Sequence, residues 1–430
     1  MRYIYNFLFY LLLPLLPLRL YLRSRKNPAY LKNWGERFAH YSTLSLKNSI
    51  WLHAVSLGEA IAAIPLIKQL QDAYPNKNIV ITTMTPTGRE KIKATFPESV
   101  FIFYVPYDYP QAVKRFLEHI EPNLLIIMET ELWPNLIYYT AKRHVPILLV
   151  NARLSLNSFL GYNRIKSFIS KVLNNITVIA AQSKEDGNRF IQLGFPSEKL
   201  HITGNIKFDI DISQNILKEA QIVIEQWKLD KTRPIWIAAS THKGEEEKVL
   251  KAARKILEKL PNALLILVPR HPERFEEVIT LCNQQGFNTI QYSKNETCTA
   301  KTQVIIGDVI GKLLMFYNIA QVAFVGGSLV PTGGHNLLEP AALDIPVVTG
   351  SSLANFQEIS ELLFNAGAAV LVRDELQLAK AILKLLIHDK RRAELVAAAK
   401  KVVAKNKGAL TKIMRLIAEA VKTEHHRYCR

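Results

Sequence analysis

Short apolar runs alternate with amphipathic segments along most of the chain. Between them lie segments of helical periodicity, such as Ala60–Asp72, Ala112–Glu118 and Pro134–Arg143. Strands that alternate with helices predict parallel sheets built from right-handed βαβ units. In the N-terminal half the runs that predict buried strands are Ile50–Val55, Ile79–Thr83, Val100–Val105, Leu124–Met128, Pro146–Val150, Ile176–Ala181 and Leu200–Thr203.

The alternation fades across residues 209–233 and then restarts. This more polar stretch is interpreted as the inter-domain connection with a flanking helix, and long helical patterns fill Leu376–Lys422. The pattern predicts an α/β protein with two doubly wound, Rossmann-like domains, residues 27–208 and 234–400, facing a central cleft and followed by a helical tail at 401–430. The later strands are predicted at Ile235–Ala239, Leu264–Val268, Val304–Ile306, Val322–Val325 and Val347–Thr349.

The N-terminal segment, residues 1–26, is apolar and then basic. Tyr3–Leu18 carries no charge and contains two prolines that would kink a helix. A bilayer-spanning helix needs roughly 20 apolar residues, so the segment fits a single-pass or half-inserted membrane anchor, with a buried helix of a soluble domain as the alternative. We favour the anchor, with the remaining chain on the cytoplasmic side, because basic residues follow the apolar run. These are Arg19, Arg23, Arg25 and Lys26.

Composition narrows the choice of partners. The 430 residues include 55 Lys and Arg against 37 Asp and Glu, a net charge of +18, which favours an anionic partner such as nucleic acid, phospholipid or a phosphorylated substrate. No signature of a nucleic-acid-binding module is present. Three cysteines, Cys282, Cys298 and Cys429, form no CxxC pair, which favours a reducing compartment and argues against a structural zinc site.

A glycine-rich loop follows the predicted strand Val322–Val325. It carries Gly326-Gly327 and Gly333-Gly334, and a helix is predicted from Asn336. In this layout backbone N–H groups can hold an anionic group, and Glu339, just inside the helix, could accept hydrogen bonds from sugar hydroxyls. The alternative is a tight turn in which the glycines only permit positive φ and close packing.

Three acids and a lysine follow strands of the N-terminal domain. Glu59, in Ser56-Leu57-Gly58-Glu59, fits a general base at the cleft, but the same spacing is a capping box that would stabilise the anion and weaken the base. Glu129 and Glu131 follow Leu124–Met128 two residues apart. Lys207 closes the last strand of this domain and could neutralise a developing negative charge.

Three further loops follow strands of the C-terminal domain. Ser240–Glu245 resembles a polar helix entry, Arg270 with His271 beside it could meet a phosphate, and Gly307–Lys312 has two glycines that permit close backbone approach. Each alone fits a surface loop. Together with the glycine-rich loop, at the carboxyl ends of the strands of one sheet, they favour a nucleotide pocket.

Several of these segments carry a resemblance that extends over nearly the whole chain. The chain resembles the Kdo (3-deoxy-D-manno-octulosonic acid) transferases of lipopolysaccharide assembly, which have the two-domain GT-B glycosyltransferase fold. The segments that carry it are WGERF (Trp34–Phe38), HAVSLGE (His53–Glu59), TTMTPTGRE (Thr82–Glu90), METELWPN (Met128–Asn135), NARLS (Asn151–Ser155), GNIKFD (Gly204–Asp209), LVPRHPERF (Leu267–Phe275) and GGSLVPTGGHNLLEP (Gly326–Pro340).

The resemblance implies transfer of Kdo from CMP-Kdo to a lipid A precursor, lipid IVA, at the anionic surface of the inner membrane. It implies Glu59 as the general base and Glu129 and Lys207 as charge-stabilising residues, with no cofactor besides the donor substrate and no nucleic-acid partner. Inversion is expected, and catalysis without a metal, because the quoted strand-end loops hold no Asp-x-Asp. The implied CMP contacts are Pro269, Arg270, Ile310, Gly311, Lys312, Asn336, Leu337, Leu338 and Glu339.

Two other functions fit parts of the pattern. One is a different GT-B enzyme that uses a UDP-sugar, which nucleotide competition would distinguish. The other is a basic, membrane-tethered binding protein without catalysis, for which substitution of Glu59 would have no effect on function.

Overall fold

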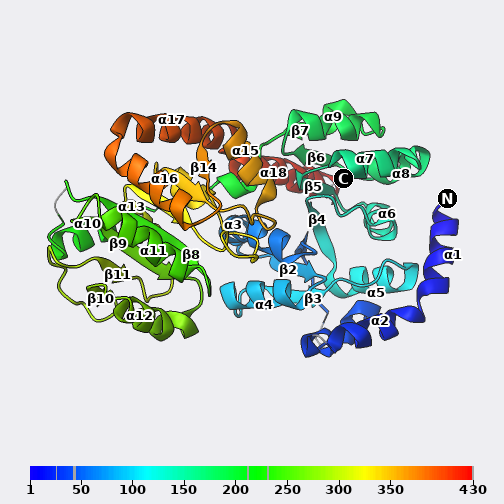
Figure 1. Cartoon of the computed structure of the whole chain (residues 1–430). Coiled ribbons are helices and arrows are strands. Elements are labelled where there is room, and N and C mark those ends of the chain that lie inside the picture. Colours follow the sequence, from blue (N-terminus) through cyan, green and yellow to red (C-terminus); the bar gives the residue numbers. More distant parts are fainter. Residues whose placement is uncertain (26, 42–44, 211–212, 230–231, 429–430) are drawn as a thin grey trace. The chain divides into compact units, whose positions relative to one another are not determined.

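The computed structural model describes residues 1–25, 27–41, 45–210, 213–229 and 232–428. The chain divides into two compact units, the first made of Met1–Asp209 with Asn406–Arg430 and the second of Ile210–Lys405 (Figure 1). Lys26 and Cys429, which belong to the expected basic flank and the cysteine set, lie outside the described residues.

The first unit is built on a seven-stranded parallel sheet of order β3-β2-β1-β4-β5-β6-β7. Its strands are continuous apolar runs, as expected where both faces of a parallel sheet are covered. The register pairs Ile50 of β1 with Ile79 of β2 and with Leu124 of β4. The strands are β1 (Ser49–His53), β2 (Asn78–Thr83), β3 (Phe101–Tyr104), β4 (Pro122–Met128), β5 (Ile147–Ala152), β6 (Val178–Ala181) and β7 (Leu200–Ile202).

Helices pack on both faces of this sheet. Ile50 and Leu52 of β1 belong to the core on one face, and Trp51 between them belongs to the core on the other, as the period of two requires. One face is covered by α3 (Leu57–Ala73), α4 (Pro86–Thr95) and α18 (Ala409–Tyr428). The other is covered by α5 (Pro110–Ile120), α6 (Pro134–Lys142), α8 (Lys166–Leu173) and α9 (Lys184–Gln192), with α7 (Leu156–Asn163) beside α8.

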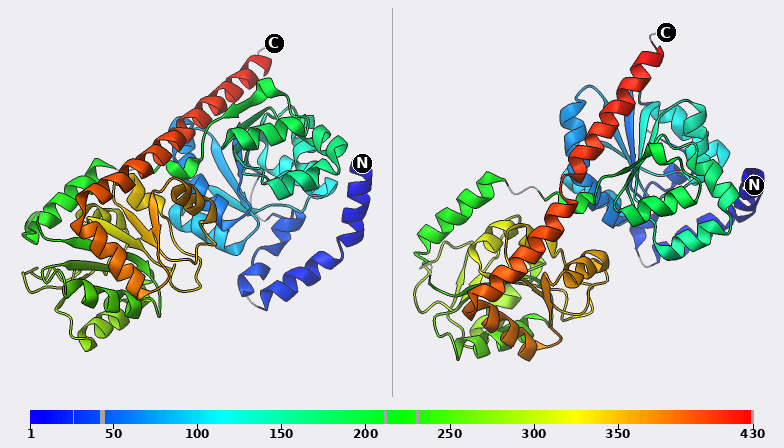
Figure 2. Two further views of the ribbon diagram at one scale, coloured as in Figure 1. Left: turned by 45° about the horizontal axis from the view of Figure 1, so that its top comes forward. Right: turned by 90° about the horizontal axis from the view of Figure 1, so that it is seen from above.

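The C-terminal helix α18 is part of the first unit, although its sequence lies beyond the second (Figure 2). Ile413 and Ile417 are fully buried against the core that contains α3. Asp209, where the chain leaves the unit, caps the start of α18 by accepting hydrogen bonds from the N–H groups of Gly408 and Leu410 at 2.5 and 2.6 Å. The segment expected to be a separate tail therefore completes a hydrophobic core.

The second unit repeats this architecture. Its seven-stranded parallel sheet has the order β10-β11-β9-β8-β12-β13-β14. Two of its strands, β10 and β14, have no counterpart among the strands predicted from the sequence. The strands are β8 (Ile235–Thr241), β9 (Leu264–Pro269), β10 (Thr289–Gln291), β11 (Val304–Ile306), β12 (Val322–Val325), β13 (Val347–Thr349) and β14 (Ala369–Leu371).

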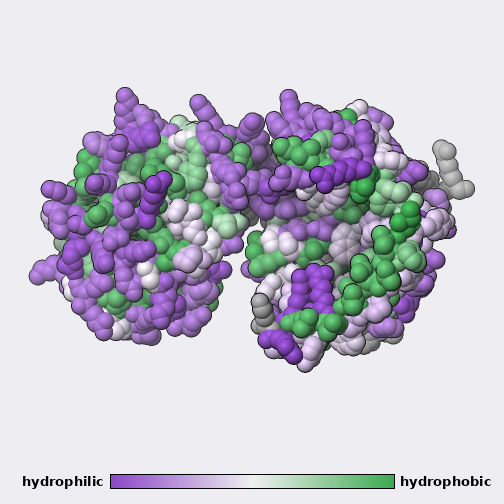
Figure 3. All heavy atoms as spheres, turned by 45° about the vertical axis from the view of Figure 1, so that its right-hand side comes forward, coloured by the Kyte–Doolittle hydropathy of each residue, from purple (hydrophilic) through white to green (hydrophobic). Residues whose placement is uncertain are grey.

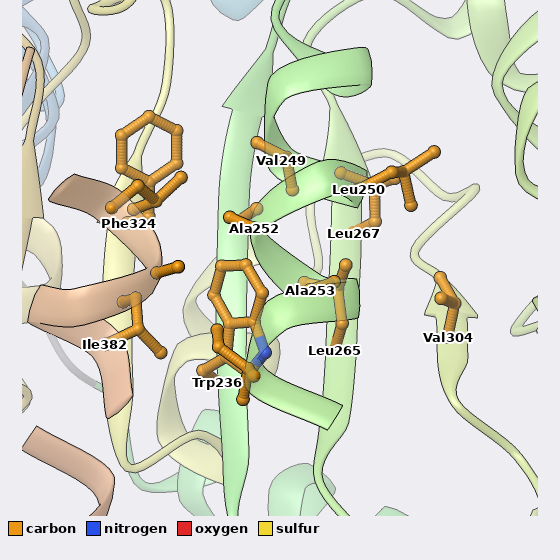
Figure 4. Packing of buried hydrophobic residues seen from close by; sticks show 14 of the residues in the cluster. Trp236, Val249, Leu250, Ala252, Ala253, Leu265, Leu267, Val304, Phe324 and Ile382 are labelled. Carbon is orange, nitrogen blue, oxygen red and sulfur yellow. The ribbon is translucent and has the colours of Figure 1, made fainter. Parts of the chain in front are cut away.

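The core of the second unit also lies on both faces of its sheet. Trp236 points into the core formed with α11 (Glu246–Leu257), α12 (Phe275–Gln284), α16 (Glu375–Ile387) and α17 (Asp389–Asn406) (Figure 4). Ile237 points into the core formed with α10 (Gln214–Gln226) and α13 (Leu313–Ile319). The short α14 (Leu338–Ala342) and α15 (Gln357–Asn365) complete the unit. Two doubly wound, Rossmann-like units confirm the predicted fold class.

The apolar N-terminus forms two helices, α1 (Arg2–Leu12) and α2 (Leu15–Ser24), bent by 55° at the break. Within the described residues no single helix is long and apolar enough to cross a membrane. Taken together, the two bent helices have the length and composition that a membrane span requires. One side of the pair packs on the first unit: the Tyr5 hydroxyl donates to Asp108 Oδ2 at 2.9 Å, and Phe9 packs beside Tyr109.

The opposite side of α1 and α2 is an exposed apolar surface. Figure 3 shows hydrophobic residues gathered in a band over this part of the first unit. Side-chain exposure reaches 69 % for Phe7 and 66 % for Leu11. Basic side chains at Arg19, Arg23 and Arg25 are exposed at the end of the segment. An exposed apolar surface does not fix the position of a membrane, so the anchor expected from the sequence stays a prediction.

Candidate active site

In each sheet two of the polar loops lie where the order of the strands reverses. In the first unit the chain leaves β1 toward β2 on one side and later returns to β4 on the other, so the loops after β1 and β4 are neighbours. In the second unit the same holds for the loops after β8 and β12. Ligands of open α/β sheets bind at such switch points, beyond the carboxyl ends of the strands.

Glu59 lies in the first turn of α3, directly after β1. Ser56 Oγ accepts a hydrogen bond from the Glu59 N–H at 3.2 Å, and the Ser56 hydroxyl donates to the Glu59 carboxylate at 2.7 Å. The Val55 N–H donates to the other carboxylate oxygen at 2.9 Å. The helix cap that the spacing predicted is therefore present: Ser56 Oγ accepts from the first turn of the helix, and the Glu59 carboxylate accepts from the residues that precede it.

The same carboxyl is nevertheless poised to exchange a proton near neutral pH. Glu59 is only 6 % exposed, and its pKa is raised from 4.5 to about 7, with burial as the largest cause. The negative charges of Glu131 and Glu129 contribute to the rise, whereas the hydrogen bonds from Ser56 and Val55 oppose it. Capping and proton transfer are thus compatible at this position, because burial outweighs the hydrogen bonds that favour the anion.

Glu129 and Lys207 form an ion pair beside Glu59. Lys207 Nζ lies 3.0 Å from Glu129 Oε1, and both side chains are partly exposed. Glu129 begins the turn after β4 with a φ of +56°, a left-handed backbone conformation that is costly for a residue with a Cβ. Glu131 instead accepts a hydrogen bond from the indole N–H of Trp133 at 2.7 Å. The structure thus gathers Glu59, Glu129 and Lys207 at one edge of one sheet.

Asn151, in β5, holds the turn that presents Lys207. Its Oδ1 accepts a hydrogen bond from the Ile206 N–H at 3.0 Å, and its carbonyl accepts one from Gln182 Nε2 at 2.9 Å. Gln182 Oε1 in turn accepts from Asn205 Nδ2 at 3.0 Å. Asn151 belongs to one of the quoted motifs but carried no predicted role, because its partner Ile206 lies 55 residues further along the chain.

The residues expected to contact CMP are spread over three loops of the second unit. Pro269 is buried at the end of β9, and Arg270 is exposed beyond it. Ile310 is 79 % exposed, and Gly311 has a φ of +82° with open space around it. The Lys312 side chain is engaged by Glu219 of α10 at 2.9 Å, so it is not directed toward the neighbouring loops. In this turn the backbone groups and the exposed Ile310 side chain are left to contact a nucleotide.

The stretch Asn336–Glu339 follows the glycine-rich loop and enters α14, which begins at Leu338 rather than at Asn336. Asn336 Oδ1 accepts a hydrogen bond from the Leu338 N–H at 3.1 Å, and Asn336 Nδ2 donates to Glu339 Oε1 at 3.3 Å. Leu337 and Leu338 are buried and shape the core beneath the loop. Burial raises the pKa of Glu339, which the hydrogen bond from Asn336 and the charge of Arg270 lower in part.

Three amides of the glycine-rich loop are already bonded within the protein. The buried Glu245 carboxylate accepts hydrogen bonds from the N–H groups of Gly327, Ser328 and Leu329 at 2.7, 3.0 and 2.9 Å. A Cβ on Gly326 would lie 2.7 Å from the same carboxylate, which explains the glycine there. A side chain of the protein therefore already fills the position in front of these three amides, and the anion expected at the N–H groups of the helix start near Asn336 stays a prediction.

Two histidines meet at the switch point of the second unit. His242, directly after β8, and His335, in the glycine-rich loop, have parallel rings whose centroids lie 5.1 Å apart. Their Nε2 atoms are 2.8 Å apart. Both histidines lie in loops that were expected to form the nucleotide pocket, but neither had a predicted role. Within the described residues no group of three His, Cys, Asp or Glu side chains has the arrangement of a metal site.

Comparison with known proteins agrees with this architecture. Residues 32–210 match the family of 3-deoxy-D-manno-octulosonic-acid transferases, and residues 219–402 match the group 1 glycosyl transferases. The UDP-GlcNAc 2-epimerase of Neisseria meningitidis has the same fold, with a TM-score of 0.53 and 14 % identity over 87 % of this chain and all of that one. The solved C-terminal CMP-Kdo binding domain of Acinetobacter baumannii WaaA is 38 % identical over 44 % of this chain and 99 % of its own, with a TM-score of 0.43.

One relative is similar over nearly its full length. It is the 3-deoxy-D-manno-octulosonic acid transferase of Haemophilus influenzae, 44 % identical over 419 residues, which are 97 % of this chain and 98 % of the relative. A match of this extent spans both units. The chain therefore belongs to the 3-deoxy-D-manno-octulosonic acid transferase family of glycosyltransferases.

Proposed function

We propose that the protein transfers Kdo from CMP-Kdo to the lipid A precursor lipid IVA, with inversion and without a metal. Family membership supports the transferred sugar. The observation that carries the mechanism is the Glu59 carboxyl, which is buried at the switch point of the first unit with a pKa of about 7. A group that titrates at the working pH is the most effective general base.

In this mechanism Glu59 accepts the proton of an acceptor hydroxyl. The hydroxyl oxygen then bonds to the anomeric carbon of Kdo, on the face opposite CMP, while the bond from that carbon to the phosphate oxygen breaks and its electron pair leaves with CMP. Attack opposite the leaving group inverts the anomeric configuration. Such substitutions pass through an oxocarbenium-like transition state, so positioning and electrostatics contribute most of the rate.

Cationic side chains offset the negative charges of the donor. Lys207 is held by Glu129 at 3.0 Å, which orients its ammonium group for charge that develops in the transition state. Arg270 supplies a guanidinium for the phosphate, and Pro269, the backbone of Ile310–Lys312 and Asn336–Glu339 shape the nucleotide pocket. These cations perform the charge neutralisation for which many nucleotide-dependent enzymes use a metal.

The lipid acceptor is reached at the cytoplasmic face of the inner membrane. The exposed apolar side of α1 and α2, with Phe7 and Leu11 at 69 % and 66 % exposure, supports burial in the headgroup and acyl boundary. Exposed Arg19, Arg23 and Arg25 support attraction to anionic lipid. Because the inner side of α1 is bonded to the first unit through Tyr5 and Asp108, this placement keeps the catalytic residues close to the lipid surface.

Product mass tests the transfer. The full-length protein is incubated with CMP-Kdo and lipid IVA in the presence of a chelator, and a mass increase of one or more Kdo units with release of CMP is expected. NMR of the anomeric centre in the product reports inversion. Transfer from a UDP-sugar instead, retention of configuration, or loss of activity with the chelator would each contradict the corresponding part of the proposal.

Vesicle flotation tests the membrane surface separately. Phe7→Asp with Leu11→Asp is expected to release the protein from vesicles that contain anionic phospholipid, because two charges would enter the apolar boundary. Ile222→Asp, at a 52 % exposed position in the second unit, is the matched control and should leave binding unchanged. Equal binding of both variants would contradict the role of α1.

A further inference from the structure

The imidazoles of His242 and His335 form a proton-sharing pair. With Nε2 atoms 2.8 Å apart, one nitrogen must donate and the other accept, so the two rings hold a single proton between these atoms. The pair bridges the loops after β8 and β12, which are adjacent strands of the sheet. Its place is therefore the switch point at which a nucleotide is expected to bind.

Basic side chains lie close to the pair. The His271 ring lies 5.2 Å from that of His242, and Arg270 and Arg274 also lower the pKa of His242 after the larger effect of burial. Burial and the charges of His242, Arg270 and His271 lower the pKa of His335 to about 4. Both imidazoles are thus neutral at pH 7 in the unliganded protein.

Each of the nearby carboxylates is held by a partner other than the two imidazole rings of the pair. Glu245 accepts the three loop amides and the backbone N–H of His242, and Glu246 pairs with Arg274 at 2.7 Å. Glu273 lies 3.7 Å from His271 Nδ1, and Glu339 accepts from Asn336. Within the described part of the chain the Arg270 guanidinium has no carboxylate within salt-bridge distance.

We propose that His242 and His335, together with Arg270, bind the phosphate of CMP and that the histidine pair takes up a proton when the phosphate binds. The amides of Gly327, Ser328 and Leu329 cannot take this role, because the Glu245 carboxylate already accepts their hydrogen bonds. A phosphate dianion replaces the repulsion between the cations with attraction and so favours an imidazolium. An imidazolium N–H and a guanidinium then donate charge-assisted hydrogen bonds to its oxygens.

The inference rests on the proposed CMP donor and adds a proton to its binding equilibrium. Because the leaving CMP carries one more negative charge on its phosphate than the intact donor, a site that gains a proton favours the cleaved state. The pair would thus act as a counter-charge that is absent before the nucleotide arrives. Arg270 alone, with a permanent charge, could not give binding this dependence on pH.

Calorimetry tests the proposal on the full-length protein. CMP is titrated at about pH 7.5, where its phosphate is largely a dianion since its second pKa is about 6, in buffers with different enthalpies of ionisation. The observed binding enthalpy should depend linearly on the ionisation enthalpy of the buffer. The slope should correspond to uptake of a fraction of one proton or more. CMP affinity should also increase as the pH is lowered toward 6.5. Cytidine, which lacks the phosphate, should bind without proton uptake.

Substitutions locate the proton. His335→Asn is expected to abolish the uptake and to weaken CMP binding by about tenfold or more, as loss of a charge-assisted hydrogen bond would. Cytidine affinity should be unchanged, which shows that the pocket is intact, and His242→Asn should repeat the result if His335→Asn folds poorly. His388→Asn, at an exposed histidine of the same unit, is the control.

The outcomes separate this inference from the proposed function. CMP binding that involves no proton, or that is as tight in His335→Asn as in the wild type, would overturn the inference and leave the donor in place. Failure of the wild type to bind CMP, or preference for UMP, would instead overturn the CMP donor and this inference with it.

Discussion

Replacement of Glu59 by Gln separates its catalytic role from its structural one. The folded protein holds the Glu59 proton with a pKa of about 7, against 4.5 for the unperturbed group. A difference of about 2.5 units corresponds to about 3 kcal/mol between the two protonation states. Because the folded-state pKa is raised, this stability is fully present below pH 4.5 and is lost as the pH rises through 7. A glutamine side chain does not titrate, so the Glu59→Gln variant lacks this loss.

The hydrogen bonds of the cap act in the opposite direction. Gln keeps an acceptor for the Val55 N–H or the Ser56 hydroxyl, and the effect of these bonds on the ionised carboxylate is already contained in the pKa of about 7. Glu59→Gln should therefore match the wild type in stability near pH 4.5, where the folded protein holds Glu59 protonated, and be more stable than the wild type by about 3 kcal/mol near pH 8.5. At the same time kcat should fall by about 10²- to 10⁴-fold, as expected for a lost general base.

Two measurements decide between the roles. Urea denaturation of wild type and variant at the two pH values gives the sign of the stability difference, and a transfer assay gives kcat. Ser56→Ala is the control, since it removes the cap hydroxyl but leaves the carboxylate, and it should lose stability while keeping most of the activity. A variant that is destabilised equally at both pH values and transfers Kdo at the wild-type rate would show that Glu59 is only a helix cap.

Three further outcomes follow from the same contacts. Lys207→Met should lower kcat by about 10²-fold or more, whereas Lys207→Arg, which can still pair with Glu129, should retain part of it; equal loss would argue against a role for the charge. Glu131→Gln should move the acid limb of the pH–rate profile to lower pH, because the charge of Glu131 raises the pKa of Glu59; an unchanged limb would contradict that coupling. Glu245→Ala leaves three buried loop amides without an acceptor and should destabilise the protein by about 3 kcal/mol or more in urea denaturation. A nearly unchanged stability would show that water replaces the carboxylate.

Much of the fold follows from hydrophobic patterning. Strands buried on both faces, such as β4 and β9, are continuous apolar runs that need no tertiary information to recognise. The strands that were missed, β10 and β14, are three residues long, lie at the sheet edges and are at most half-buried. A short edge strand is defined by the neighbour it pairs with, and that pairing is absent from the local sequence.

The site was predictable in position but not in chemistry. Motif resemblance and the carboxyl-end rule place Glu59, Glu129 and Lys207 at the carboxyl ends of strands of one sheet, yet they leave Glu59 as either a cap or a base. Burial decides its pKa, and burial depends on how the whole sheet packs. Likewise Glu245 meets amides more than eighty residues away, and His242 meets His335 from 93 positions away, so no local pattern indicates either contact.

Each unit contains a buried titratable group, and the two groups acquire charges of opposite sign. In the first, burial and neighbouring acids keep a carboxyl partly protonated at neutral pH, so Glu59 acquires negative charge as the pH rises. In the second, burial and neighbouring cations keep His335 neutral, so it acquires positive charge only as the pH falls or an anion arrives. If both groups act as proposed, the acid limb of kcat belongs to Glu59 and the alkaline limb of kcat to the histidine pair, because kcat reports the complex in which the donor has already raised the pKa of the pair. The pH range of activity then depends on the burial of Glu59 and of the histidine pair, since burial is the largest influence on the pKa of Glu59 and of His335.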